Sequence, residues 1–120
     1  MAAAALLGGM AFANSGLGAA HGIGMAVGIA YHVPHGEACG ILLPHVMKLN
    51  QKKAEERMAK IGEALTGRRF AKPEEGAQAA VDFILELNAH MEIKPDFKHL
   101  GILARISKNW RGQLRNQHEQ

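Results

Sequence analysis

The stretch that decides the fold runs from Gly16 to Asn50 and reads GLGAAHGIGMAVGIAYHVPHGEACGILLPHVMKLN. It holds four of the seven histidines and the sole cysteine, Cys39. From Met1 to Met47 the only charged side chain is Glu37. Neutral imidazoles in an uncharged surround rich in glycine and alanine are typical of a metal site in a dry pocket. A single histidine taken alone is better explained as a hydrogen-bonded core residue, so the metal-site interpretation depends on the cluster.

Proline divides this stretch into two expected helices. Residues 15 or 16 to 30 predict a buried helix in which Gly24 and Gly28 are helix–helix contacts. Val33-Pro34 ends that helix, because the residue before a proline avoids the helical region. The next helix is expected to open at His35 and to continue to about residue 50, with a kink or a restart at Pro44.

Helices are also predicted on both sides of the central stretch. Residues 2–13 predict a helix that is apolar all round and therefore deeply buried. Residues 51–66 and 72–91 predict two amphipathic helices, the second with proline and acids in its first turn. The expected apolar stripes are Ala54, Met58, Ile61 and Leu65, and then Ala77, Ala80, Val81, Phe83, Ile84 and Leu87.

Towards the C-terminus, Asp96 is expected to cap a short turn that ends at Leu100, and residues 101–113 predict a weaker helix. There is no convincing strand pattern and no internal repeat. The expected fold class is therefore all-α, a bundle-like arrangement in a single helical domain over residues 1–120.

The composition of the chain narrows the range of possible functions. The chain has 120 residues, of which 48% are hydrophobic and 21% charged, as in a globular domain. One cysteine excludes an intramolecular disulfide and favours a reducing cytoplasm. The net charge of +3 is concentrated in residues 102–120, too few cations for a nucleic-acid surface. Residues 1–20 lack the positive start of a signal peptide and are interrupted by Asn14 and Ser15, so no membrane span is expected.

Spacing selects His21 and His35 as the expected metal ligands. On one continuous helix their fourteen-residue separation would span about 21 Å, so the Val33-Pro34 break is needed to bring the imidazoles together. His32 forms an H-x-x-H pair with His35, but a capping or solvent-facing role fits it equally well. Cys39 lies one turn after His35 and could face the same region, although a small buried thiol fits it better.

A metal bound by His21 and His35 would need further ligands. His45 follows His35 by roughly three turns and is excluded on distance. A catalytic metal normally keeps three or more protein ligands, and this chain offers two good ones. Either a segment outside this chain supplies the rest, or two copies pair and give four imidazoles across a twofold axis.

The segment from Phe12 to Asn50 resembles the metal-binding half of the iron-containing (group III) alcohol dehydrogenases. Their pattern is approximately F-S-N-x-G-L-G-x-x-H-x-x-x-H-x-L-G-x-x-x-x-x-P-H-G-x-A-x-A-x-L-L-P-x-V-M, and the match needs no gap. It continues more loosely over nearly the whole chain. The resemblance implies the family's C-terminal helical domain, of dehydroquinate synthase-like architecture, without its N-terminal nucleotide-binding α/β domain.

The same resemblance implies roles for individual residues. His21 and His35 fall on two of the family's four metal ligands, and the other two, an Asp and a His, lie upstream of Met1. Phe12 falls on an aromatic of the substrate pocket. Met25 stands where the family often has a second histidine near the nicotinamide. No residue of this chain is assigned as catalytic.

The implied reaction is hydride transfer between a small alcohol or aldehyde and NAD(P), with Fe(II) or Zn(II) as Lewis acid. This chain alone is expected to be inactive without the N-terminal nucleotide-binding domain. The alternative is a non-catalytic oligomeric module, metal-binding or structural. A homo-oligomer is expected in both cases, because residues 1–30 would leave a large apolar patch on a monomer.

Overall fold

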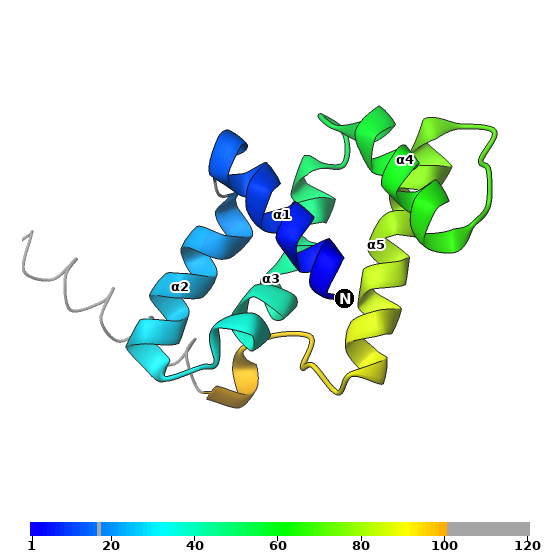
Figure 1. Cartoon of the computed structure of the whole chain (residues 1–120). Helices are drawn as coiled ribbons and strands as arrows, with labels where there is room; N and C mark the ends of the chain where they lie inside the picture. Colours follow the sequence, from blue (N-terminus) through cyan, green and yellow to red (C-terminus); the bar gives the residue numbers. More distant parts are fainter. Residues whose placement is uncertain (17, 101–120) are drawn as a thin grey trace, which may run out of the picture.

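The computed structural model of the chain describes residues 1–16 and 18–100, which form five α-helices and one 3-10 turn. The helices are α1 (Ala2–Ser15), α2 (Ala19–Tyr31), α3 (His35–Asn50), α4 (Glu55–Thr66) and α5 (Pro73–His90), followed by η1 (Lys98–Leu100) (Figure 1). These ranges contain no strand. The all-α prediction is confirmed, whereas the helix expected over residues 101–113 lies outside the described residues.

Helix α3 continues through Pro44 and does not restart there. Proline has no backbone N–H, so the helix cannot satisfy the carbonyl of Gly40, four residues earlier. The side chain of Asn88 on α5 takes over: its Nδ2 donates to the Gly40 carbonyl at 2.8 Å. Asn88 is 9% exposed, so this bond holds α5 against α3 from inside the protein.

The tightest contact in the fold is the crossing of α4 and α5. A Cβ added at Gly62 would overlap the backbone carbonyl oxygen of Gly76, so only glycine fits at this point. A Cβ at Gly76 would come within 3.0 Å of Ala59 Cα. The stripe predicted for α4 is wrong at Ile61, which is 47% exposed, because the neighbouring glycine is the residue that faces α5.

The hydrophobic core lies among α3, α4 and α5. A cluster of Met58, Ala77 and Val81 joins α4 to α5, and Met47 and Ala54 pack against it. The other buried hydrophobic residues among the described ones are Val33, Ala38, Ile41 and Ala80. The stripe predicted for α5 is confirmed at its alanines and Val81, while Leu87 is 41% exposed.

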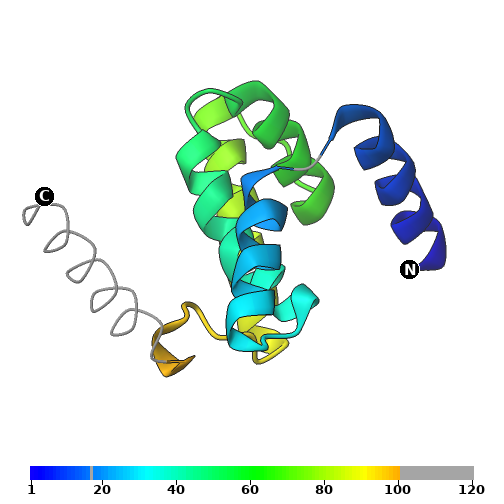
Figure 2. The ribbon, with the colours of Figure 1, turned by 90° about the vertical axis from the view of Figure 1, so that its left-hand side faces the viewer.

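The two N-terminal helices differ from the prediction of deep burial. No residue of α1 is buried, and in α2 only Gly24 is. Figure 2 shows α1 standing apart from the other helices. Within the described part of the chain, the apolar side chains of α1 stay uncovered, whereas α2 packs on α3 and leaves Ile23, Met25 and Ile29 exposed.

No single helix among the described residues is long and apolar enough to cross a bilayer. Only α1 and α2 taken together, across a sharp bend, reach that length and composition.

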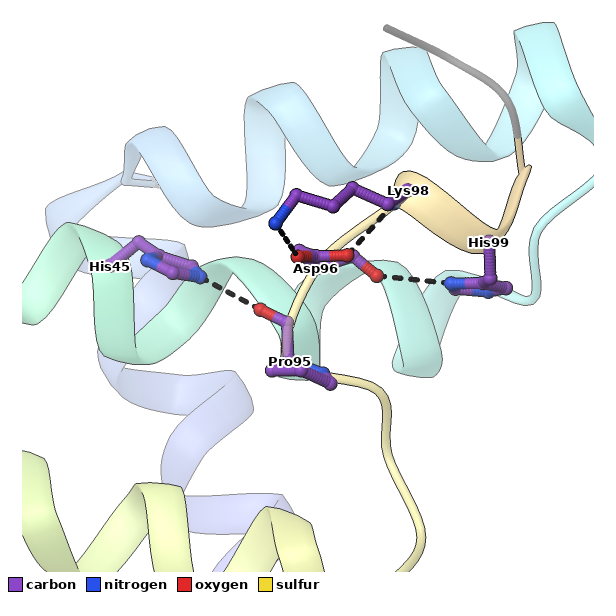
Figure 3. Close-up of polar contacts among 5 residues, drawn as sticks. All are labelled: His45, Pro95, Asp96, Lys98 and His99. Carbon is purple, nitrogen blue, oxygen red and sulfur yellow. Dashed lines mark hydrogen bonds and ion pairs between the residues drawn. The ribbon is translucent and has the colours of Figure 1, made fainter.

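The segment after α5 returns to α3 and α2. The Asp96 carboxylate accepts a hydrogen bond from the backbone N–H of Lys98 at 2.9 Å, which confirms the predicted cap of the turn. The same two residues form an ion pair at 3.0 Å (Figure 3). These bonds from Lys98 hold the pKa of Asp96 below its usual value. His45 Nε2 lies 3.0 Å from the carbonyl oxygen of Pro95 and ties the segment to α3.

Candidate metal centre

The candidate site forms where the chain turns between α2 and α3, at an elbow made of residues 32–34. Helix α2 ends at Tyr31, and His32 adopts the left-handed conformation with φ 55°. Pro34, with φ −53° and ψ 132°, then leads into α3 at His35. The chain therefore turns back and α2 packs along α3 (Figure 1). The break that the sequence required at Val33-Pro34 is present.

Close packing of the two helices sets the position of the side chains. A Cβ added at Gly24 would lie 3.0 Å from Cys39 Sγ and 3.3 Å from the Cys39 backbone nitrogen. Gly24 is thus the contact point between helices that was predicted. Gly28 also sits closely, with its added Cβ 3.1 Å from the Val33 carbonyl, so it packs on the elbow itself.

Three side chains converge at this crossing: His21 from α2, and His35 and Cys39 from α3. The rings of His21 and His35 have centroids 4.5 Å apart and meet edge to face at 69°. Cys39 Sγ lies 3.6 Å from His35 Nε2 and 4.0 Å from Nδ1. One ligand atom from each of the three residues lies within 4.8 Å of the others. Within residues 1–16 and 18–100, no other group of three or more potential ligands meets this condition.

The cluster is open to solvent on one side. His21 and Cys39 are half-buried and His35 is exposed. Incoming ligands can therefore reach an ion held here, while the inner side of the cluster is fixed by the packing of α2 on α3.

The other histidines of the central stretch lie elsewhere. His32 is exposed and occupies the left-handed position that ends α2, which fits the capping role left open for it. His45 contacts Pro95 and is not in the cluster. The sequence-based prediction that Cys39 is a small buried thiol does not match the structure, in which Cys39 is half-buried and lies close to two imidazoles. The four-residue spacing from His35 was the signal for it.

The two predicted substrate-pocket residues stay predictions. Phe12 is 50% exposed on α1, the helix that stands apart (Figure 2). Met25 is 45% exposed and lies one turn after His21 on α2. The structure places Met25 on the same helix as His21 and does not bring Phe12 into the cluster.

Comparison with known proteins decides the family. Residues 1–110 match the Fe-containing alcohol dehydrogenase family, C-terminal part. This chain belongs to the iron-containing alcohol dehydrogenases. The match includes α1 to α5 and every residue of the cluster, so the family assignment and the candidate metal centre rest on the same part of the chain.

Individual relatives within the iron-containing alcohol dehydrogenases agree. The chain is 39% identical over 105 residues to the NADPH-dependent butanol dehydrogenase of Clostridium saccharobutylicum, covering 86% of this chain and 26% of that protein. It is 36% identical over 103 residues to the lactaldehyde reductase of Escherichia coli K12, covering 85% and 27%. Alcohol dehydrogenase 4 of Saccharomyces cerevisiae S288c gives 36% over 104 residues, covering 85% and 26%.

The chain thus spans about a quarter of the length of the curated relatives it matches. It corresponds to one part of these larger dehydrogenases, the helical C-terminal part. No solved structure gives a significant match.

Proposed function

We propose that this chain supplies the metal- and substrate-binding domain of an NAD(P)-dependent alcohol dehydrogenase. The observation that carries the proposal is the convergence of His21 and His35 from two helices, with ring centroids 4.5 Å apart. An upstream nucleotide-binding domain would complete the enzyme, and it would bring the Asp and His that the family adds to the ligand set. The single cysteine fits work in a reducing cytoplasm.

The donor set fits a divalent metal. His21 and His35 would hold Fe(II) or Zn(II), because imidazole nitrogen suits both ions. When bound, such an ion acts as a Lewis acid that stabilises the alkoxide form of an alcohol. The exposed side of His35 leaves room for ligands from another domain and for the substrate oxygen. The chain's own part is to hold two ligands at a fixed angle on rigid helices.

The substrate side is built from apolar groups. Met25 follows His21 by one helical turn and would face the same space as the ion. A thioether cannot donate or accept a catalytic proton, so proton transfer from the alcohol would use solvent or a group of the other domain. Phe12 on α1 would close the pocket once α1 is packed against that domain. A small alcohol or aldehyde is the substrate class this lining suits.

The exposed apolar helices indicate where the other domain would sit. On α1, Leu6, Leu7 and Met10 are 57–65% exposed, and on α2 Ile29 is 74% exposed. Exposed large apolar side chains concentrated on two neighbouring helices are typical of an interaction site. The surface lies on the same helices as His21 and Phe12, so docking there would bring the missing ligands close to the cluster.

A chimera tests the proposal. The matching segment of the C. saccharobutylicum butanol dehydrogenase would be replaced by residues 1–120 of this chain, and alcohol oxidation would be followed through NADPH formation. We expect activity in the chimera and a loss of at least about a hundredfold in the His21→Ala and His35→Ala forms, since each removes a ligand that positions the ion. His90→Ala is the control, because that exposed imidazole lies outside the cluster and hydrogen-bonds the Glu86 carbonyl of its own helix.

The outcomes separate two functions. A folded chimera that is inactive, or one in which both histidine variants keep full activity, contradicts the proposal. The alternative is a non-catalytic oligomeric module, which the exposed apolar surface of α1 and α2 also favours. That alternative gains if the chain on its own forms a stable dimer holding one ion per dimer, as measured by native mass spectrometry and elemental analysis.

A further inference from the structure

We propose that Cys39 is a third metal-binding residue, so that this chain by itself presents a His2Cys site for a thiophilic divalent ion such as Zn(II). The inference rests on the proposed function for its use of His21 and His35. It goes beyond the family pattern, which leaves the position of Cys39 unspecified.

The distances match tetrahedral coordination. With Zn–N of about 2.0–2.1 Å and Zn–S of about 2.3 Å, a tetrahedral angle puts nitrogen and sulfur about 3.6 Å apart. Cys39 Sγ and His35 Nε2 are 3.6 Å apart. The other donor pairs lie within 4.8 Å, and small rotations of the His21 and His35 side chains can bring these pairs to coordination distance.

The position of the thiol is fixed by its surroundings. Sγ lies in the crossing of α2 on α3, where the absence of a side chain at Gly24 makes room for it. Cys39 and His35 lie one turn apart on the same face of α3, and His21 approaches from α2. Three donors on two packed helices form a half-shell, and the exposed side leaves a fourth position open.

A sulfur donor would change the preferred ion. Thiolate ligands favour Zn(II), whereas sites of imidazole and carboxylate alone also suit Fe(II). Binding would convert the Cys39 thiol to the thiolate and release its proton to solvent. The expected consequence is that this chain selects Zn(II) and Co(II) over Fe(II) and Mg(II).

The test uses Co(II) as a spectroscopic probe on the full, reduced chain without oxygen. We expect the wild type to bind Co(II) with a thiolate-to-cobalt charge-transfer band in the near ultraviolet and the strong visible bands of a tetrahedral ion. Cys39→Ala and Cys39→Ser should lose the charge-transfer band, with Co(II) affinity at least about tenfold weaker, since even the loss of a group that only hydrogen-bonds a metal ligand can weaken affinity by that much. His90→Ala should keep wild-type spectra, and circular dichroism would confirm that each variant is folded.

Three results would overturn the inference. If Co(II) binds the wild type without a thiolate band and Cys39→Ala binds it equally well, Cys39 only hydrogen-bonds His35, and the histidine pair and the proposed function stand. If the wild type binds no Co(II), the chain has no self-contained site, and activity of the chimera still decides the proposed function. If the band survives in His21→Ala at unchanged affinity, the ion is held elsewhere.

Discussion

The two halves of this protein differ in what their apolar residues contact. Helix α5 packs on both α4 and α3, and these three helices hold every buried hydrophobic residue of the described ranges except Val33 in the elbow. Helices α1 and α2 are more apolar, yet only Gly24 is buried in them. The amphipathic helices thus bury their apolar stripes within the chain, whereas α1, and the side of α2 that faces away from α3, expose apolar surface that suits another domain or a second copy.

The largest effect is expected from Gly62→Ala, which tests the close packing of α4 on α5. Gly62→Ala places a Cβ against the backbone carbonyl of Gly76, which cannot move aside as a flexible side chain can. We expect the free energy of unfolding to fall by about 3 kcal/mol or more. Urea denaturation followed by circular dichroism measures it.

Gly22→Ala on α2 is the matched control for the glycine at the crossing. Nothing lies within 4 Å of its added Cβ, so the better helix propensity of alanine should stabilise the chain by up to about 1 kcal/mol. Equal effects of the two alanines would remove the contrast between the halves.

The second effect tests the bond that holds α5 to α3. Asn88→Ala leaves the Gly40 carbonyl without its partner, and we expect a loss of about 2 kcal/mol. In a Pro44→Ala background the new backbone N–H can satisfy that carbonyl, so the same substitution should cost about 1 kcal/mol less. A double-mutant cycle by urea denaturation gives the coupling. Additive losses would mean that Asn88 acts only by filling space.

The smallest effect compares one residue type in the two halves. Ile41 is 1% exposed on α3 and Ile29 is 74% exposed on α2. Ile41→Val should lower the free energy of unfolding by about 1 kcal/mol, and Ile29→Val should change it by less than about 0.5 kcal/mol. Similar losses in both variants would show that α2 is buried in solution, for instance in a dimer.

Local sequence patterns predicted much of the fold. Proline and glycine positions predicted the helices to within a few residues, and the elbow at Val33-Pro34 was required by the spacing of His21 and His35. The contact at Gly62 was missed because a stripe of apolar side chains does not include glycine. The burial expected for α1 and α2 was wrong because composition shows that a helix suits an apolar environment, without showing which molecule provides it.

Only part of the candidate site was predictable, because local spacing does not show which residues meet in the folded chain. The two histidines were chosen from spacing and resemblance. The place of Cys39 depends on the close approach at Gly24, a tertiary contact that spacing along one helix cannot supply. The bond from Asn88 to Gly40 joins residues 48 positions apart, and no local pattern predicts such a pair.

The bond from Asn88 to Gly40 can form only after residue 88 has been synthesised. A ribosome releases the chain from its N-terminus, so α3 emerges well before residue 88 is made. Until then the Gly40 carbonyl, one residue after Cys39, can be satisfied only by water. The turn that carries the thiol therefore reaches its final form only after residue 88 has been made, although its own residues emerge much earlier.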